Sequence, residues 1–240
     1  MKIQNSYSLN VLMLIVFITC VTGCKKEPSY SLNKEAVTLT SSGTFQLSIQ
    51  GGAAETFSYV SDNSLVATID ANGLITGKRV GETTIKVSGN NFTGACTVSI
   101  SPLYNTFIEP ITQFGISKNE VKSKETRTLL TEVETAMLFK GNTEEKYAMY
   151  VFENGKLTSS LIVLASSYSS VLGSYIAERY VIASLSPILG YSIDKKFAVG
   201  VELQSSLDWW VIYFPYTLTL AKTSLITSKS LQFKSLLKQM

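Results

Sequence analysis

The chain has 240 residues, which is enough for one large domain or two small ones. Lysine and arginine number 21 against 18 for aspartate and glutamate, so there is no strongly basic field of the kind that holds nucleic acid. Histidine is absent, which excludes imidazole-based catalytic triads, zinc sites with a histidine ligand and an imidazole acid or base. Catalysis would have to use carboxylates, a serine–lysine pair or tyrosine.

The first residues of the chain have the layout of an export signal. Lys2 gives the start a positive charge, residues 11–18 form a short apolar run, and small residues then lead to Cys24. The ending Val21-Thr22-Gly23-Cys24 resembles the lipobox of bacterial lipoproteins. The resemblance implies cleavage before Cys24 and attachment of lipid to its thiol, which anchors a protein in a membrane. An uncleaved spanning helix is the alternative, but it requires about 20 apolar residues and this run is shorter.

This layout predicts a signal peptide over residues 1–23 and a tether over residues 24–28. The mature chain is then a lipid-anchored protein of the cell envelope, with the membrane as its first partner. Lys25-Lys26 stands where an aspartate retains some lipoproteins at the inner membrane, so we expect the outer membrane, on its periplasmic or its outer side. With Cys24 acylated, Cys96 is an isolated thiol, and we expect it to be buried.

Residues 29–101 have the pattern of an all-β sandwich. Short stretches alternate between apolar and polar residues, and turn residues separate them at intervals of about 8 to 12 residues. In the last stretch Cys96, Val98 and Ile100 fall on one face, which predicts that this face lies in the core. The dipeptide Asn72-Gly73 is expected to supply the positive φ values of a tight hairpin turn.

A specific motif lies inside this region, between Ser61 and Val87. Its pieces are Ser61, Ala67-Thr68-Ile69-Asp70, Asn72-Gly73-Leu74-Ile75-Thr76-Gly77 and Gly81-Glu82-Thr83-Thr84-Ile85. They resemble the hallmark of the bacterial Ig-like domain, group 2, although that family commonly has a tryptophan where this chain has Tyr59 and Val60. The resemblance implies an immunoglobulin-like sandwich, used in bacterial surface proteins as a spacer or an adhesion module. We expect a stalk, with ligand binding by this domain as the alternative.

Residues 102–217 follow a break at Ser101-Pro102 and mix helical with strand patterns. Ser117-Lys118-Asn119-Glu120 is a capping box that starts a short helix. Apolar residues at helical spacing predict a second helix over residues 167–182. Strand-like runs follow the helices in two groups of three, at residues 129–139, 146–152, 157–164, 188–193, 197–203 and 209–214. This order predicts an α+β domain with an antiparallel sheet and two helices. A duplicated unit of one helix and three strands is an alternative, without a residue pattern shared by the two halves.

The carboxylates of this domain offer one route to catalysis. Glu132 and Glu134 would point the same way from a strand, as the paired carboxylates of an enzyme acting on glycan or peptide would. A solvated strand face is the simpler interpretation, and Glu144-Glu145 is expected in a hairpin turn that faces water. We therefore expect a non-catalytic protein without metal site or cofactor, and we keep an envelope enzyme as the alternative.

Aromatic residues offer a route to binding. Trp209 and Trp210 are adjacent on a predicted strand, so their rings point to opposite faces of the sheet, with Tyr213 on the side of Trp209. One ring is expected in the core, and the other either packs under a helix or stacks on a sugar or a protein partner. These three residues are the candidate ligand-binding set.

Residues 218–240 differ in charge from what precedes them, because they contain four lysines and no acidic residue. Their apolar residues gather on one side of a helical wheel, which predicts a basic amphipathic end that touches a membrane surface. A disordered tail is the alternative, because Lys229 falls inside the apolar arc.

Overall fold

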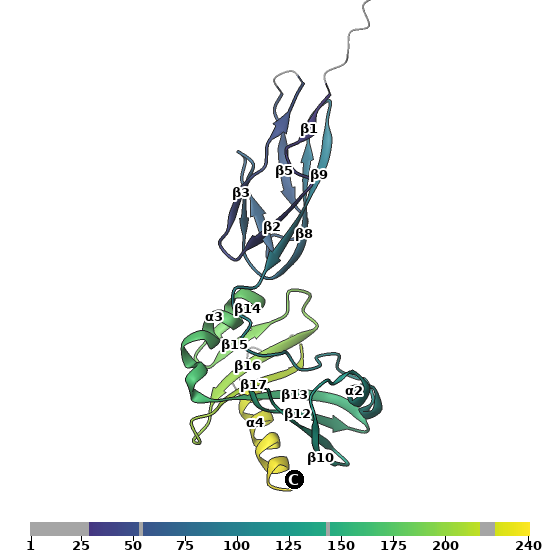
Figure 1. Ribbon diagram of the computed structural model, residues 1–240, viewed down its shortest axis with the longest axis vertical. Coiled ribbons are helices and arrows are strands. Elements are labelled where there is room, and N and C mark those ends of the chain that lie inside the picture. Colours follow the sequence, from purple (N-terminus) through teal and green to yellow (C-terminus); the bar gives the residue numbers. More distant parts are fainter. Residues whose placement is uncertain (1–28, 53–54, 143–144, 217–223) are drawn as a thin grey trace, which may run out of the picture.

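The computed structural model describes residues 29–52, 55–142, 145–216 and 224–240. Figure 1 shows two domains in series, an elongated β domain followed by a wider domain built on one large sheet. The predictions for the signal peptide, the tether and Cys24 lie outside the described residues. Within the described ranges, no helix has both the length and the apolar character that a membrane span requires.

The first domain consists of short strands in two sheets, with a small strand pair at one end. The larger sheet has the order β2-β9-β8-β5, the smaller has the order β3-β7-β6, and β1 pairs with β4. The strands are β1 Ser31–Leu32, β2 Ala36–Thr40, β3 Thr44–Gln46, β4 Ile49–Gln50, β5 Ser58–Ser61, β6 Ala67–Ile69, β7 Leu74–Gly77, β8 Gly81–Ser88 and β9 Thr93–Ser101. Cys96, Val98 and Ile100 are buried in the core between the sheets, as the alternation predicts. Burial raises the pKa of the Cys96 thiol.

The hairpin between β6 and β7 differs in one detail from the sequence prediction. In this turn, which lies wholly within the described residues, Gly73 has a positive φ of 83° and Asn72 does not. The Asp70 carboxylate closes the turn by accepting the N–H groups of Asn72 and Leu74, each at 2.9 Å. A side chain at Gly73 would lie 2.5 Å from the Leu47 carbonyl oxygen, so glycine is required at this one position.

The second domain is an antiparallel sheet with helices on both faces. Within the described residues its strand order is β10-β11-β12-β13-β17-β16-β15-β14. The strands are β10 Leu129–Val133, β11 Ala136–Lys140, β12 Glu145–Glu153, β13 Lys156–Leu164, β14 Val181–Leu185, β15 Ile188–Tyr191, β16 Phe197–Leu203 and β17 Trp209–Pro215. The helices are α2 Lys118–Lys124, α3 Ser169–Arg179 and α4 Ser224–Leu237, with a 3-10 turn η1 at Ser166–Tyr168 before α3. In this described part, a helix followed by a four-strand meander occurs twice, and the last strands of the two meanders, β13 and β17, pair at the centre of the sheet.

Two sequence predictions for this domain are wrong in detail. The run 129–139 is a hairpin that turns at Glu134 and Thr135, so each half has four described strands instead of three. The predicted second helix ends at Arg179, because the β-branched residues that follow continue as β14. The helical wheel of residues 218–240 predicted an amphipathic end, and the described part of this segment forms a third helix, α4.

Two apolar layers cover the sheet. On one face lie α2, α3 and residues 102–116, which we call the crossing segment. On the other face lies α4, whose Ile226, Phe233 and Leu236 are buried. A Cβ at Gly200 would lie 2.6 Å from Ile226, so glycine allows the helix to approach β16 closely. These apolar side chains of α4 therefore contact the sheet, and are not presented to a membrane.

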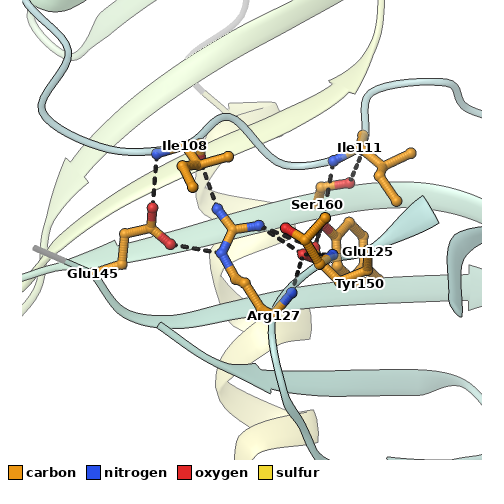
Figure 2. Close-up of polar contacts among 8 residues, drawn as sticks. Ile108, Ile111, Glu125, Arg127, Glu145, Tyr150 and Ser160 are labelled. Carbon is orange, nitrogen blue, oxygen red and sulfur yellow. Dashed lines mark hydrogen bonds and ion pairs between the residues drawn. The ribbon is translucent and has the colours of Figure 1, made fainter. Parts of the chain in front are cut away.

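The crossing segment is held in place by a buried ion cluster (Figure 2). Arg127 donates from Nε to Glu145 at 2.6 Å and from Nη1 to Glu125 at 3.0 Å, and its Nη2 donates to the Ile108 carbonyl oxygen at 2.5 Å. Glu145 accepts the Ile108 N–H in return, at 2.7 Å. The prediction that Glu145 faces water is wrong, because its side chain is fully buried (0% exposed).

A second group of bonds holds the crossing segment at Ile111. The Ile111 N–H donates to the Tyr150 hydroxyl at 3.2 Å, and the Ile111 carbonyl oxygen accepts a bond from the Ser160 hydroxyl at 2.7 Å. Tyr150 in turn donates to Glu125, which joins this group to the ion cluster. Burial and the charge of Glu125 raise the pKa of Tyr150 well above its ordinary value, so the hydroxyl keeps its proton.

The positions of the two tryptophans predict different costs of substitution. Trp210 is buried and packs edge-on against Phe233 of α4, with ring centroids 6.3 Å apart, whereas Trp209 is partly exposed and packs on the opposite face. We expect Trp210→Ala to lower the free energy of unfolding by about 3 to 5 kcal/mol and Trp209→Ala to lower it by about 1 to 2 kcal/mol. Urea unfolding of both variants checks this, and equal losses would contradict the assignment of the two rings.

The ion cluster predicts a large loss of stability when its cation is removed. Burial alone would lower the pKa of Arg127, but the bond to Glu145 and the charge of Glu125 raise it, so the guanidinium stays charged. Arg127→Met leaves two buried carboxylates without a counter-charge, and we expect a loss of about 3 to 5 kcal/mol in the free energy of unfolding. The control is Lys122→Met, which breaks an exposed ion pair with Glu132 and should cost no more than about 1 kcal/mol. Similar losses in the two variants would argue against the cluster.

Candidate functional site

Arg79 and Val80, in the loop before β8, attach the first domain to the end of α3. Arg79 Nε donates to the Tyr180 carbonyl oxygen at 3.0 Å, while its Nη1 donates to the Leu65 carbonyl oxygen of its own domain at 3.3 Å. The Val80 N–H donates to the Glu178 carbonyl oxygen at 2.7 Å. These bonds use carbonyl groups at and just beyond the end of the helix, where acceptors are left without intrahelical partners.

Glu178 also fixes the connection between the domains. Its buried carboxylate accepts the N–H groups of Leu103 at 3.0 Å and Tyr104 at 3.1 Å. It forms an ion pair with Arg179, whose guanidinium lies 3.8 Å from the centroid of the Tyr175 ring. Glu178 therefore joins three parts of the molecule, since its carbonyl group binds the first domain and its side chain binds the start of the crossing segment.

A cleft of about 390 Å³ lies beside this junction, with walls from both domains. This volume is in the range of sites that bind small molecules or single side chains. The charged and aromatic residues that line it are Glu82, Glu109, Arg179, Tyr180, Asp194 and Phe197. We take this cleft as the candidate functional site.

Glu109, on the crossing segment, is the best-positioned carboxylate of the cleft. The hydroxyl groups of Tyr175, at 3.3 Å, and of Tyr180 both donate to its Oε1 atom, and Arg179 Nε lies 3.9 Å from the same oxygen. Burial and the Glu109 charge raise the pKa of both tyrosines well above the ordinary value, so both remain hydrogen-bond donors. No described residue donates to Oε2, and the Glu109 side chain is 37% exposed.

Asp194 is a second carboxylate of the cleft, and it is engaged. It accepts a bond from the Ser192 hydroxyl at 2.7 Å and pairs with Lys196 at 2.8 Å. Burial acts to raise its pKa, but the bonds from Lys196 and Ser192 lower it below the ordinary value.

Phe197 packs edge-on against Tyr180, with centroids 6.0 Å apart. Carboxylate oxygens beside aromatic rings suit a ligand that donates hydrogen bonds.

The residues predicted to bind a ligand lie elsewhere. Trp210 is buried under α4, and Tyr213 is fully buried on the other face. The Tyr213 hydroxyl is buried, and its ring packs against Tyr180 at a centroid distance of 6.3 Å. Trp209 is partly exposed, and a ligand-binding role for it stays a prediction.

The predicted carboxylate pair is not brought together as the sequence suggested. Glu132 lies on β10, where Lys118 at 2.9 Å and Lys122 at 3.0 Å neutralise it. Bonds to these two lysines lower the pKa of Glu132. Glu134 lies in the turn after β10, because the predicted strand is a hairpin, so it does not share a strand face with Glu132.

Sequence patterns did not indicate Glu109 and Tyr180, which line the cleft, or Glu178, which fixes the junction beside it. Glu109 precedes a proline in a segment without periodicity, and Tyr180 lies within residues 167–182, for which the spacing predicts a helix. Hydrogen bonding joins Glu109 to Tyr180 across 71 positions, so no local pattern indicated the pair. The one sequence signal near the cleft is the break at Pro102, because Pro102 is the first residue of the crossing segment that contains Glu109.

Comparison with solved structures finds partial similarity to intimin and to an S-layer protein. A complex of intimin with Tir90 is 27% identical, with 30% of this chain and 45% of that chain covered and a TM-score of 0.24. An intimin mutant of EHEC O157:H7 is 19% identical over 43% of this chain and 61% of that chain, with a TM-score of 0.26. Domains 5–6 of the S-layer protein SbsC are 12% identical over 80% of this chain and 88% of that chain, with a TM-score of 0.27. The chain thus spans less than two thirds of the two intimin structures.

The family comparison concerns the first domain. No curated protein matches the chain. The family model that matches is described as bacterial Ig-like domain (group 2), and it covers residues 28–99. This range contains both sheets of the first domain almost completely, and it confirms the resemblance carried by the motif between Ser61 and Val87. Residues 28–99 are therefore a bacterial Ig-like domain of group 2.

Proposed function

We propose that the chain is a non-catalytic binding protein of the bacterial cell envelope. A lipid on Cys24 anchors it, the Ig-like domain holds the second domain away from the membrane, and the cleft between the domains receives a protein or glycan ligand. The observation that carries this proposal is the junction at Glu178, because it fixes a spacer domain to a sheet domain around a cleft built from both.

The arrangement of the junction supports the role of a spacer. The Ig-like domain comes first after the predicted anchor, and Arg79 and Val80 bond it to the end of α3. A linkage through several backbone acceptors transmits position from one domain to the next, whereas a flexible linker does not. The cleft is then held in a fixed position relative to the Ig-like domain.

The chemistry of the carboxylates supports binding over catalysis. Of the two acids that the sequence offered for catalysis, Glu132 is paired with two lysines and Glu134 lies in the turn after β10. In the cleft, Glu109 accepts bonds from protonated tyrosines and Asp194 is paired with Lys196. Catalytic pairs of carboxylates usually combine one acid of raised pKa with one ionised partner, whereas hydrogen bonds lower the pKa of both Glu132 and Asp194.

The binding role predicts a saturable ligand without turnover. Soluble protein comprising residues 24–240 with Cys24→Ser, tested on arrays of surface proteins and glycans, should retain one ligand that mass spectrometry recovers unmodified. Arg79→Ala loosens the cleft and should weaken binding by about threefold to tenfold. The control is Lys86→Ala, which breaks an exposed ion pair of the same domain and should leave binding unchanged. Turnover of the ligand, or no binding on either array, would overturn the proposal.

The anchor predicts a modified amino terminus. The lipobox resemblance and the charged pair Lys25-Lys26 support an outer-membrane lipoprotein, displayed on the periplasmic or the outer side. Mass spectrometry of the native protein should find the chain starting at Cys24 with lipid attached, and Cys24→Ala should release it from the detergent phase into the aqueous phase on fractionation. An unmodified Cys24 in the membrane-bound protein would refute lipid anchoring.

A further inference from the structure

The hydrogen-bond donors and acceptors of the cleft indicate the class of ligand, and this inference rests on the binding role proposed above. The arginine donors are already engaged. Arg79, which precedes Val80 of the cleft wall, donates to backbone carbonyl oxygens of both domains. Arg179 is paired with Glu178, bonded to Asn105 at 3.1 Å and stacked on Tyr175. A ligand that needs cationic donors would therefore have to displace bonds that hold the junction together.

Acceptors in the same cleft are available. Glu109 uses Oε1 for both tyrosine hydroxyls, and no described residue donates to its Oε2. Glu82, on the wall from the Ig-like domain, uses Oε2 for the Ser99 hydroxyl at 3.2 Å, and its Oε1 has no donor among the described residues. The two residues that line the cleft from different domains thus each have one carboxylate oxygen without a donor among the described residues.

The aromatic residue beside these oxygens adds a second preference. Phe197 lines the cleft and is only partly buried, and its orientation is fixed by the edge contact with Tyr180. A cation held over an aromatic face and bonded to a carboxylate gains from both interactions. The planar guanidinium group matches this combination best, because it stacks on rings and bonds carboxylates through a fork of donors.

We propose that the cleft binds a basic side chain, preferably arginine, of a protein partner. Glu109 and Glu82 accept its hydrogen bonds, and Phe197 contacts its planar group. Tyr175 and Tyr180 act as positioning residues, since both donate to Glu109 from buried positions. The chain as a whole carries a net charge of +3, so the attraction of a cation to this place is local to the cleft.

A labelled peptide tests this proposal. Fluorescein-labelled tetra-arginine, titrated with the soluble protein of residues 24–240 at about 0.15 M salt, should bind by anisotropy, and labelled tetra-glutamate should not. Glu109→Gln should weaken the binding of tetra-arginine at least about tenfold, since a bond to a charged group is lost. The matched control is Glu132→Gln, a carboxylate outside the cleft, which should leave the affinity within about twofold if the binding is local to the cleft.

A second variant, Glu82→Gln, keeps the proposal testable if Glu109→Gln does not fold. Glu82 is exposed on the Ig-like domain, so Glu82→Gln should leave the melting temperature unchanged. It should weaken tetra-arginine binding by about threefold or more. Equal affinities in the Glu109, Glu82 and Glu132 variants would overturn the proposal, as would binding of a glucosamine tetramer in place of tetra-arginine. If an array ligand binds normally while tetra-arginine does not, this inference fails and the proposed function stands.

Discussion

The peptide groups of the crossing segment lie against an apolar sheet, and the geometry of the junction depends on how those groups are satisfied. Buried N–H and C=O groups require partners, and this segment belongs neither to a strand nor to a helix over residues 102–116. Side chains from the second domain supply the partners instead. Glu178 binds the start of the segment, Arg127 and Glu145 bind its middle, and Tyr150 and Ser160 bind it at Ile111.

This constraint explains why the cleft contains an ordered carboxylate. Glu109 lies between Leu103, whose N–H group bonds to Glu178, and Ile111, whose N–H group bonds to Tyr150. Its position therefore follows from backbone bonds on either side of it. The same helix end that binds the crossing segment also binds Val80 of the Ig-like domain. One set of polar contacts therefore orients the Ig-like domain, the crossing segment and the cleft together, which links the fold to the proposed binding role.

Much of the fold could be predicted because its signals are local. The Ig-like domain shows its alternation, its glycine turn and its motif within short stretches, and the capping box at Ser117 is present in the structure as predicted. The errors in the second domain occur where a local pattern is ambiguous. The apolar run that contains Glu134 reads as one strand but is a hairpin, and the apolar residues after Arg179 continue the helical spacing but form an edge strand.

The site could not be predicted because its bonds join residues that are far apart in the chain. Arg127 and Glu145 are 18 positions apart, and Glu109 and Tyr180 are 71 positions apart. A glutamate beside a turn is expected to face water when the sequence shows no partner for it. Glu145 was therefore predicted at the surface, since its partner Arg127 is distant in the sequence. Conversely, Trp210 and Tyr213 are large aromatic residues, which the sequence alone suggested as ligand-binding residues. Both are buried, so their aromatic rings serve the packing of the core.

Amide hydrogen exchange of the crossing segment tests this account most directly. Ile108 and Ile111 donate their N–H groups to Glu145 and Tyr150, whose side chains are buried, although neither isoleucine belongs to a helix or strand. If these bonds hold the segment, both amides should exchange within about tenfold of the rates of β13, which lies at the centre of the sheet. Exchange at the rate of an exposed loop would contradict the claim that buried side chains fix the crossing segment and the cleft.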